Sequence, residues 1–268
     1  MPGSLRDAVE RAAAVLERAG CDTPRLDAEV LVAEATGLAR ERVHLDPDTD
    51  VARGQEFRLG EHIRRRIDRE PVAYILGRRA FRRIELAVDP RVLIPRPETE
   101  LLVEVALDLP PGAWVHDVGT GSGAVALAIA YERPDLRVTA SDASSAAVEV
   151  AQKNAERLGL PVEMMATAGL PVEATGADLV VANLPYVTEA EWDTLAPEIT
   201  GFEPREALVS GPDGLNAIRE LVAGLPSGAR LALEHAPGQA AAVRGLLAHS
   251  TTRRDLAGLE RATVGRVP

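Results

Sequence analysis

Cysteines, long apolar runs and membrane-like segments are scarce in this sequence, and each scarcity excludes a class of protein. Cys21 is the only cysteine among 268 residues, so no disulfide can form within the chain and a disulfide-stapled scaffold is excluded. No apolar run reaches the roughly 18 residues that a membrane-spanning helix needs, and the N-terminal residues show no apolar segment typical of a secretion signal. We therefore expect a cytoplasmic protein that does not enter a membrane.

Basic residues are outnumbered by acidic ones. The chain carries 30 Lys and Arg against 41 Asp and Glu, a formal net charge of −11. Binding to duplex nucleic acid depends on releasing counterions from many phosphate contacts, so this balance argues against nucleic acid as the main partner. The remaining composition, 46% hydrophobic and 26% charged, is that of a globular chain long enough for a large domain and a smaller one.

The first third of the sequence is dominated by helical patterns. One helix is expected from about Leu5 to Gly20, a second from about Pro24 to Gly37, and a third over 51–69. Residues 70–95 then change to alternating apolar positions, which predicts a short hairpin or an extended linker. No group of His, Cys and carboxylate residues has metal-ligand spacing, so no metal is expected.

The remainder of the chain alternates apolar strand patterns with helical ones. This alternation predicts an α/β domain with a mostly parallel sheet. The expected strands lie at about 114–118, 136–141, 162–166, 177–182 and 230–234, with helices that include 122–132 and 144–158.

An arginine cluster lies where the helical first third of the chain ends. It could bind nucleic acid or an acidic partner, but "HIRRRIDRE" is better interpreted as the solvated face of a helix. Its members are Arg64, Arg65, Arg66, Arg69, Arg78, Arg79, Arg82 and Arg83.

The first chemical signal is a glycine-rich turn in "WVHDVGTGSGAVALAIA". A predicted strand ends at Val118, and Gly119, Gly121 and Gly123 follow it before a helix begins. Glycines let the backbone approach a ligand closely, and the helix start offers free N–H groups. Asp142 ends the next strand, where a carboxylate can accept hydrogen bonds from ribose hydroxyls.

The turn by itself leaves the ligand open. It also fits the dinucleotide fingerprint of NAD and FAD proteins, or a structural turn without any nucleotide. Asp117, two residues before the first glycine, favours S-adenosylmethionine, because a carboxylate there lies near the cationic methionine portion of that cofactor.

The second signal is "VVANLPYV", where a buried strand ends in Asn183, Leu184, Pro185 and Tyr186. In a doubly wound sheet this end faces the same crevice as the glycine turn. The Asn183 side-chain oxygen and the Leu184 carbonyl can accept the two N–H groups of a planar –NH₂, and Tyr186 can form a flat wall. Such a tip aims a poorly nucleophilic nitrogen at the methyl group and stabilises the charge that develops on it.

Several motifs together carry a family resemblance. "EPVAYILG", "LIPRPETELLVE", "DVGTGSGAVALAIA", "ANLPYV", "FEPREAL", "GPDGL" and "RATVGR" occur in this order, and the chain resembles the release-factor glutamine N5-methyltransferases over nearly its whole length. The resemblance implies a class I, Rossmann-like methyltransferase acting in translation termination. It also implies S-adenosyl-L-methionine as cofactor and the glutamine of the Gly-Gly-Gln loop of peptide chain release factors as methyl acceptor.

The resemblance also assigns roles by position. A helical substrate-docking domain would cover 1–72, a hairpin linker 73–95 and the methyltransferase domain 96–268. Arg96, Pro97 and Glu100 of the loop "IPRPETE" would help close the substrate pocket, and the tip residues Asn183, Leu184, Pro185 and Tyr186 would act on the acceptor. The residues implied to bind the cofactor are Asp117, Gly119, Thr120, Gly121, Ser122, Gly123, Asp142, Gly169 and Asn183.

Two departures from the family pattern keep alternatives open. Leu184 stands where the family usually has proline, and Ala168 and Gly169 stand where it usually has an acidic and a bulky residue near the adenine. The Asn-Leu-Pro-Tyr spelling also resembles that of ribosomal RNA adenine N6-dimethylases. The alternatives are therefore an N-methyltransferase for adenine in RNA or DNA or for a small-molecule amide, and a cofactor-binding paralogue that has lost transfer.

Overall fold

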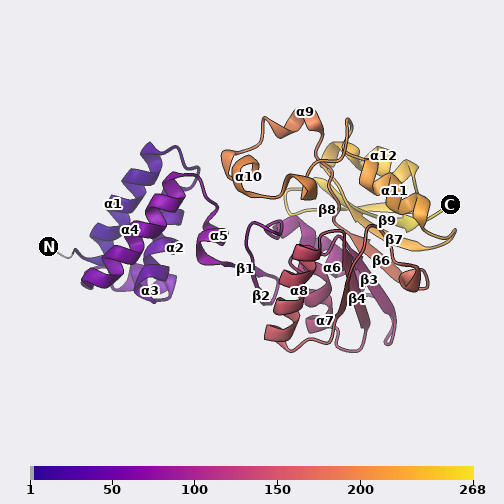
Figure 1. Ribbon diagram of the computed structural model, residues 1–268, viewed down its shortest axis with the longest axis horizontal. Helices are drawn as coiled ribbons and strands as arrows, with labels where there is room; N and C mark the ends of the chain where they lie inside the picture. The colour runs from indigo at the N-terminus through magenta and orange to yellow at the C-terminus, as the bar shows by residue number, and fades with distance from the viewer. Residues whose placement is uncertain (1–2) are drawn as a thin grey trace. The chain divides into compact units, whose positions relative to one another are not determined.

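The computed structural model describes residues 3–268, which form two compact units (Figure 1). One unit comprises the described residues up to Gly77 together with Ala196–Phe202, and the other comprises Arg78–Leu195 and Glu203–Pro268. The short segment 196–202 therefore belongs to the N-terminal unit although it is distant in sequence. Within residues 3–268 no helix is long and apolar enough to cross a membrane.

The N-terminal unit is helical, as the periodicity predicts. Ser4 caps its first helix by accepting a hydrogen bond from the backbone N–H of Asp7, whose side chain accepts from Ser4 in return. The apolar faces of the helices form a core of their own. The helices of this unit are α1 (Leu5–Arg18), α2 (Pro24–Thr36), α3 (Arg40–Leu45), α4 (Arg53–Ile67), α5 (Val72–Leu76) and α10 (Pro197–Phe202).

Three short helices of this unit, α3, α5 and α10, were not predicted. Helix α3 buries only Val43, too few apolar positions to show a helical period. Helix α5 occupies part of the segment that we expected to be extended. It is a single turn between Pro71 and Gly77, and five residues are too few to distinguish a helical pattern from an alternating one. The predicted hairpin follows it as β1 (Arg78–Phe81) and β2 (Ile84–Ala87), paired antiparallel.

The arginine-rich helix α4 contributes one of its charges to the interior of the helical unit. Arg66 is only 6% exposed and forms ion pairs with Asp27 on α2 (2.7 Å) and Glu198 on α10 (2.8 Å). Arg69 also pairs with Glu198, at 2.7 Å. The expectation of a solvated helix face fits Arg64, which is 69% exposed, but it is wrong for Arg66.

The larger unit is built on a seven-stranded sheet with the order β5-β4-β3-β6-β7-β9-β8. Five strands pair in parallel, and β9 pairs antiparallel with both β7 and β8 at one edge of the sheet. The five parallel strands lie where the sequence predicts them. The strands are β3 (Trp114–Val118), β4 (Arg137–Asp142), β5 (Glu163–Ala166), β6 (Leu179–Ala182), β7 (Arg230–Glu234), β8 (Ala248–Arg254) and β9 (Glu260–Arg266).

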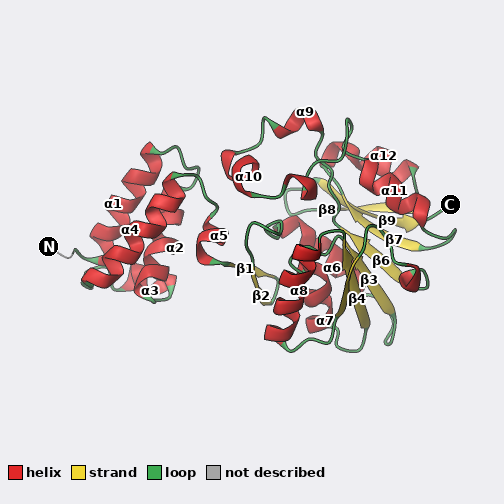
Figure 2. Ribbon diagram, viewed as in Figure 1, coloured by secondary structure: helices red, strands yellow, loops and turns green. Residues whose placement is uncertain are grey.

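Helices pack on both faces of this sheet (Figure 2). Strand β6 shows why: Leu179 and Val181 belong to the core under α6 and α7, whereas Val180 and Ala182 belong to the core under α11 and α12. Successive strand residues point to opposite faces, so a strand buried on both sides is apolar throughout. The helices of this unit are α6 (Glu100–Leu107), α7 (Ala124–Glu132), α8 (Ser145–Leu158), α9 (Glu189–Trp192), α11 (Asn216–Gly224) and α12 (Ala240–Gly245).

The strand order places a switch point between β3 and β6. The chain runs from β3 outward through β4 to β5 and then returns to place β6 beside β3, with Val118 paired to Ala182. Ligands of open α/β sheets bind in the crevice beyond the carboxyl ends of the strands at such a point. The residues that follow Val118 and Ala182, Gly119 and Asn183, are the two chemical signals of the sequence.

Candidate active site

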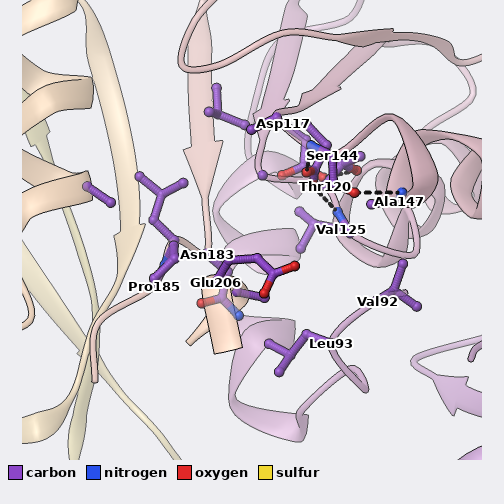
Figure 3. A pocket seen from close by; sticks show the side chains of 18 of the residues that line it. Val92, Leu93, Asp117, Thr120, Val125, Ser144, Ala147, Asn183, Pro185 and Glu206 are labelled. Atoms are coloured by element: carbon purple, nitrogen blue, oxygen red, sulfur yellow. Dashed lines mark hydrogen bonds between the residues drawn. The ribbon is translucent and has the colours of Figure 1, made fainter. Parts of the chain in front are cut away.

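A cavity of about 620 Å³ opens at this switch point (Figure 3). Its lining includes most of the residues predicted to bind the cofactor and three of the four tip residues. The predicted residues that line it are Arg96, Asp117, Gly119, Thr120, Gly121, Ser122, Asp142, Gly169, Asn183, Leu184 and Pro185. Within the described residues, Pro97, Glu100, Gly123 and Tyr186 are not part of the lining.

The glycine turn is held by the neighbouring strand. The backbone N–H groups of Gly119 and Thr120 both donate to the carbonyl of Ser141 on β4, at 2.9 and 3.0 Å. Gly119 has a φ of +75°, and a Cβ at this position would lie 3.0 Å from Cδ2 of Leu184. The turn and the Asn183 tip therefore pack directly against each other, and only glycine fits between them without strain.

Asp117 is a buried carboxylate with one free oxygen. Its Oδ2 accepts hydrogen bonds from the Thr120 hydroxyl (2.7 Å) and the Ala126 backbone N–H (3.2 Å). Among the described residues Oδ1 has no hydrogen-bond partner. Burial, with a smaller contribution from the charge of Asp142, raises the pKa of Asp117 to about 7. An unpartnered buried carboxylate oxygen on a cavity wall fits the ammonium group of S-adenosylmethionine.

Asp142 stands on the same wall, at the end of β4. Its two oxygens accept backbone N–H groups from both flanks of the crevice, Oδ2 from Gly121 (2.9 Å) and Oδ1 from Ser144 (2.9 Å). These bonds fix the carboxylate on the turn, and each oxygen keeps a further lone pair for a ligand hydroxyl. The position suits the predicted ribose contact. Gly169, next to Ala168, lines the cavity and its carbonyl accepts from the Ser141 hydroxyl at 3.4 Å.

Asn183 is held by its amide nitrogen. Its Nδ2 donates to the hydroxyl of Thr99 at 3.0 Å, so the side-chain oxygen Oδ1 is left for a ligand. Thr99 ends the short 3₁₀ turn Pro97–Thr99 and is buried. This partner of the Asn183 amide lies in the loop before α6, and we did not anticipate it from the sequence.

Tyr186 does not form the cavity wall that we expected. Its hydroxyl donates to Oε1 of Glu234, at the end of β7, at 3.2 Å. Burial and the nearby Glu234 charge raise the pKa of Tyr186 above its ordinary value. Burial also raises the pKa of Glu234 to about 7, although the hydroxyls of Thr99 and Tyr186 act in the opposite direction.

Of the three residues predicted to close the substrate pocket from the loop "IPRPETE", only Arg96 lines the cavity. Arg96 lines the cavity and pairs with the buried carboxylate of Glu203. Thr99 lines it as well, whereas the side chain of Glu100 accepts a hydrogen bond from the backbone N–H of Arg82 at 3.2 Å. Glu203 also accepts from the backbone N–H of Ile94 at 3.1 Å, which anchors the start of the loop.

Four residues that the sequence did not single out contact the tip residues Asn183 and Tyr186: Thr99, Gly214, Glu234 and Gln239. The Gln239 side chain donates to the backbone carbonyls of Tyr186 (2.8 Å) and Asp213 (3.1 Å). Gly214 packs so closely on the Tyr186 carbonyl that a Cβ there would lie 2.1 Å from it. The motifs "IPRPETE" and "GPDGL" contain Thr99 and Gly214, so the signal was present, but their roles depend on packing against the tip.

The fold and the site together define a class I methyltransferase: a mostly parallel seven-stranded sheet, a glycine turn after β3 and a polar tip after β6. Among solved structures, the hMettl16 catalytic domain in complex with the MAT2A 3′UTR hairpin 6 shares this fold, with a TM-score of 0.54 and 15% identity over 67% of this chain and 75% of that one. This likeness concerns the fold alone.

Comparison with known sequences identifies the family. Residues 7–77 match the PrmC N-terminal domain, and residues 97–203 match the methyltransferase small domain. The release factor glutamine methyltransferase of Burkholderia pseudomallei is 43% identical, covering 91% of this chain and 92% of that protein. That of Mycolicibacterium smegmatis is 42% identical, covering 96% and 95%. The chain therefore belongs to the family of release factor glutamine methyltransferases.

This membership confirms the predicted family, the α/β fold class, the class of enzyme and S-adenosylmethionine as methyl donor. It does not favour the alternatives of a nucleic-acid or small-molecule methyltransferase, nor of a paralogue without transfer. The roles of the individual site residues and the boundaries 1–72, 73–95 and 96–268 stay predictions.

Proposed function

We propose that this protein transfers a methyl group from S-adenosylmethionine to the side-chain amide nitrogen of the glutamine in the Gly-Gly-Gln loop of peptide chain release factors. The observation that carries the proposal is the orientation of Asn183. Because Nδ2 is engaged by Thr99, Oδ1 is available to accept an N–H of the acceptor amide in the cavity.

The donor side of the cavity would be organised by the glycine turn. Asp117 would hold the ammonium group through its free Oδ1, and Asp142 would accept from the ribose hydroxyls. The bound cofactor supplies a methyl group on a positively charged sulfur. The chain's own contribution is to keep that sulfur beside the tip, since Gly119 and Leu184 pack against each other.

The acceptor side would be organised by the tip. An amide nitrogen is a poor nucleophile because its lone pair is delocalised into the carbonyl. Asn183 Oδ1 and the Leu184 carbonyl would accept its two hydrogens, draw the nitrogen toward pyramidal geometry and aim the lone pair at the methyl group. Both oxygens also stabilise the positive charge that develops on nitrogen during in-line displacement. The methylated nitrogen then loses one proton to water.

Mass spectrometry tests the proposal directly. A purified release factor is incubated with this protein and S-adenosylmethionine, and tandem fragmentation locates any added methyl group. The expected result is the mass gain of one methyl on the Gly-Gly-Gln glutamine, with no gain when that glutamine is replaced. If cofactor binding is intact and the release factor stays unmodified, the acceptor is another molecule and Leu184 marks the change.

A further inference from the structure

Glu234 is a buried carboxylate beside the catalytic tip, and no step proposed above uses it. It ends strand β7 and is 2% exposed. Oε1 accepts from the Tyr186 hydroxyl at 3.2 Å. Among the described residues Oε2 makes no hydrogen bond of ordinary geometry, but the Thr99 hydroxyl is close enough to lower the pKa of this carboxyl. Buried carboxylates with an unused oxygen are costly, which suggests a function.

Thr99 connects this carboxylate to Asn183. A threonine hydroxyl has one hydrogen to donate and two lone pairs that accept. Thr99 already accepts from Asn183 Nδ2 at 3.0 Å, so its own hydrogen is free for another acceptor. The carboxylate of Glu234 is an acceptor in that neighbourhood, and it also receives the hydroxyl of Tyr186.

We propose that Glu234 is a positioning residue for methyl transfer, whose carboxylate orients Asn183 through Thr99 and Tyr186 through its hydroxyl. This inference rests on the proposed function. An ionised carboxylate has no hydrogen to donate, so any hydrogen bond between it and the Thr99 or Tyr186 hydroxyl has the hydroxyl as donor. Thr99 can then only accept from Asn183, and Oδ1 of Asn183 faces the acceptor amide.

A neutral side chain at position 234 reverses this arrangement. A protonated carboxyl can donate to Thr99, which is then free to donate to Asn183. The Asn183 amide would turn over and present its –NH₂ to the –NH₂ of the acceptor, two donors facing each other. Such a contact has no hydrogen bond and leaves polar groups unpaired, which disfavours the transition state.

The charges around Glu234 influence the pH at which its carboxyl group becomes protonated. Glu98, in the loop before Thr99, raises the pKa of Glu234, and Arg261 of β9 lowers it. Arg261 is itself paired with Asp255 at 3.0 Å. The ring of the adjacent His235 bonds to Thr263 at 2.8 Å. Burial outweighs these effects and raises the pKa of Glu234 to about 7, so its protonation can be followed in assays near neutral pH.

The kinetic test compares wild type with Glu234→Gln at saturating cofactor, so that titration of Asp117 does not enter kcat. Wild-type kcat is expected to be about tenfold lower at about pH 6 than at about pH 8, the ratio for one group that titrates near pH 7. Glu234→Gln should lower kcat at least about tenfold, leave cofactor affinity within about twofold, and abolish the pH dependence. A wild-type profile in the variant would overturn the proposal.

Glu132→Gln is the matched control. Glu132 is a half-buried residue of this unit whose side chain is 8% exposed and paired with Arg82 at 2.9 Å, and it does not line the cavity. This variant should keep the wild-type kcat and its pH profile. A general loss of stability, by contrast, would affect both variants alike.

Two further variants test whether Glu234 acts through the hydroxyls of Tyr186 and Thr99. Tyr186→Phe removes a donor that lowers the pKa of Glu234, so the acid limb of the kcat profile should move to higher pH. Thr99→Val should reduce kcat as much as Glu234→Gln does, and the double variant should lose no more than either single one. A limb that moves to lower pH, or losses that multiply in the double variant, would contradict the connection.

A measurement without turnover separates this inference from the proposed function. In ¹⁵N-labelled protein, the side-chain amide signals of Asn183, assigned with Asn183→Asp, should shift with a midpoint near pH 7 in wild type and stay constant in Glu234→Gln. If wild type methylates no release factor but the signals titrate, only the proposed function fails. If they do not titrate, the positioning role is wrong whatever the activity.

Discussion

At the residue scale, the proposed mechanism assigns transfer and cofactor binding to different side chains of one cavity. Asn183 would face the acceptor, so Asn183→Ala should reduce methyl transfer by at least about 10²-fold, as loss of a preorganised charge-stabilising group does. Cofactor affinity should change by no more than a few fold. Initial rates with a release factor and calorimetric binding of S-adenosylhomocysteine measure the two quantities. Undiminished transfer in this variant would remove Asn183 from the mechanism.

The raised pKa of Asp117 predicts how cofactor affinity depends on pH. Its pKa in the free protein is raised to about 7, chiefly by burial, and an ammonium ligand prefers the ionised form. Cofactor affinity should therefore be constant above about pH 7 and fall by up to about tenfold per unit below it. Isothermal titration with S-adenosylhomocysteine across this range measures the effect.

Asp117→Asn separates charge from hydrogen bonding at this position. The asparagine oxygen can keep the bonds to Thr120 and Ala126, while its –NH₂ would face the ammonium group. Affinity should be low in this variant and independent of pH near neutrality. Asp135→Asn, an exposed carboxylate of the same unit, should behave as wild type. If Asp117→Asn retained the pH dependence, another group would hold the ligand.

At the element scale, the tip proposed to act on the acceptor is an irregular segment held by two other loops. After β6 the chain pairs with the end of "FEPREAL" and the residues that follow it: the Val187 N–H donates to the carbonyl of Leu208 at 2.8 Å, and its carbonyl accepts from the Ser210 N–H at 2.9 Å. Gly214 of "GPDGL" and Gln239 then contact the Tyr186 carbonyl. The two motifs therefore stabilise the position of the tip.

Gly214→Ala tests this support. Gly214 has a φ of +74°, and its new Cβ would meet the Tyr186 carbonyl oxygen at 2.1 Å. The backbone of the tip must shift, so transfer should fall at least about tenfold. Gly112→Ala is the matched control, because Gly112 has a φ of +78° and no described atom lies within 4 Å of its Cβ position.

Both glycine variants carry similar backbone strain, about 1–2 kcal/mol. Thermal unfolding should therefore show a comparable loss of stability from this source, while only Gly214→Ala loses activity in steady-state assays. Equal activity of the two variants would mean that the contact with Tyr186 does not hold the tip in place.

At the scale of the whole molecule, the N-terminal unit incorporates residues from far along the chain. Arg66 joins α2, α4 and α10 through Asp27 and Glu198. Its removal leaves the buried Asp27 without an ionic partner and Glu198 with Arg69 alone, and removing one partner of a buried ion pair typically costs about 3–5 kcal/mol. Arg66→Ala should therefore raise hydrogen–deuterium exchange in α2 and α4 strongly, as measured by mass spectrometry of the peptides.

Arg64→Ala is the control for that measurement. Arg64 lies on the same helix, is 69% exposed and approaches Glu61 only at 3.9 Å. Its loss should change stability by less than about 0.5 kcal/mol. If both variants exchanged at the wild-type rate, the buried ion pairs would contribute nothing to the stability of this unit.

The sequence predicted long elements well and short ones poorly. Strands such as 230–234 and the helix near 144–158 were found because their apolar positions repeat over one or more periods. Helices α3 and α5 have six and five residues and were missed. The cavity lining was anticipated where it follows a strand end, as at Gly119 and Asn183, because strand order in a parallel sheet brings such ends together.

The sequence by itself determined the α/β class, the glycine turn and the Asn-Leu-Pro-Tyr tip, since local periodicity and short motifs carry these features. Only the tertiary structure decided which groups orient the tip. Thr99 and Asn183 are 84 residues apart, and Tyr186 and Glu234 are 48 apart. No local pattern encodes such pairs. They meet because the sheet aligns the ends of β6 and β7 beside the loop before α6, where burial makes each hydrogen bond and each charge matter.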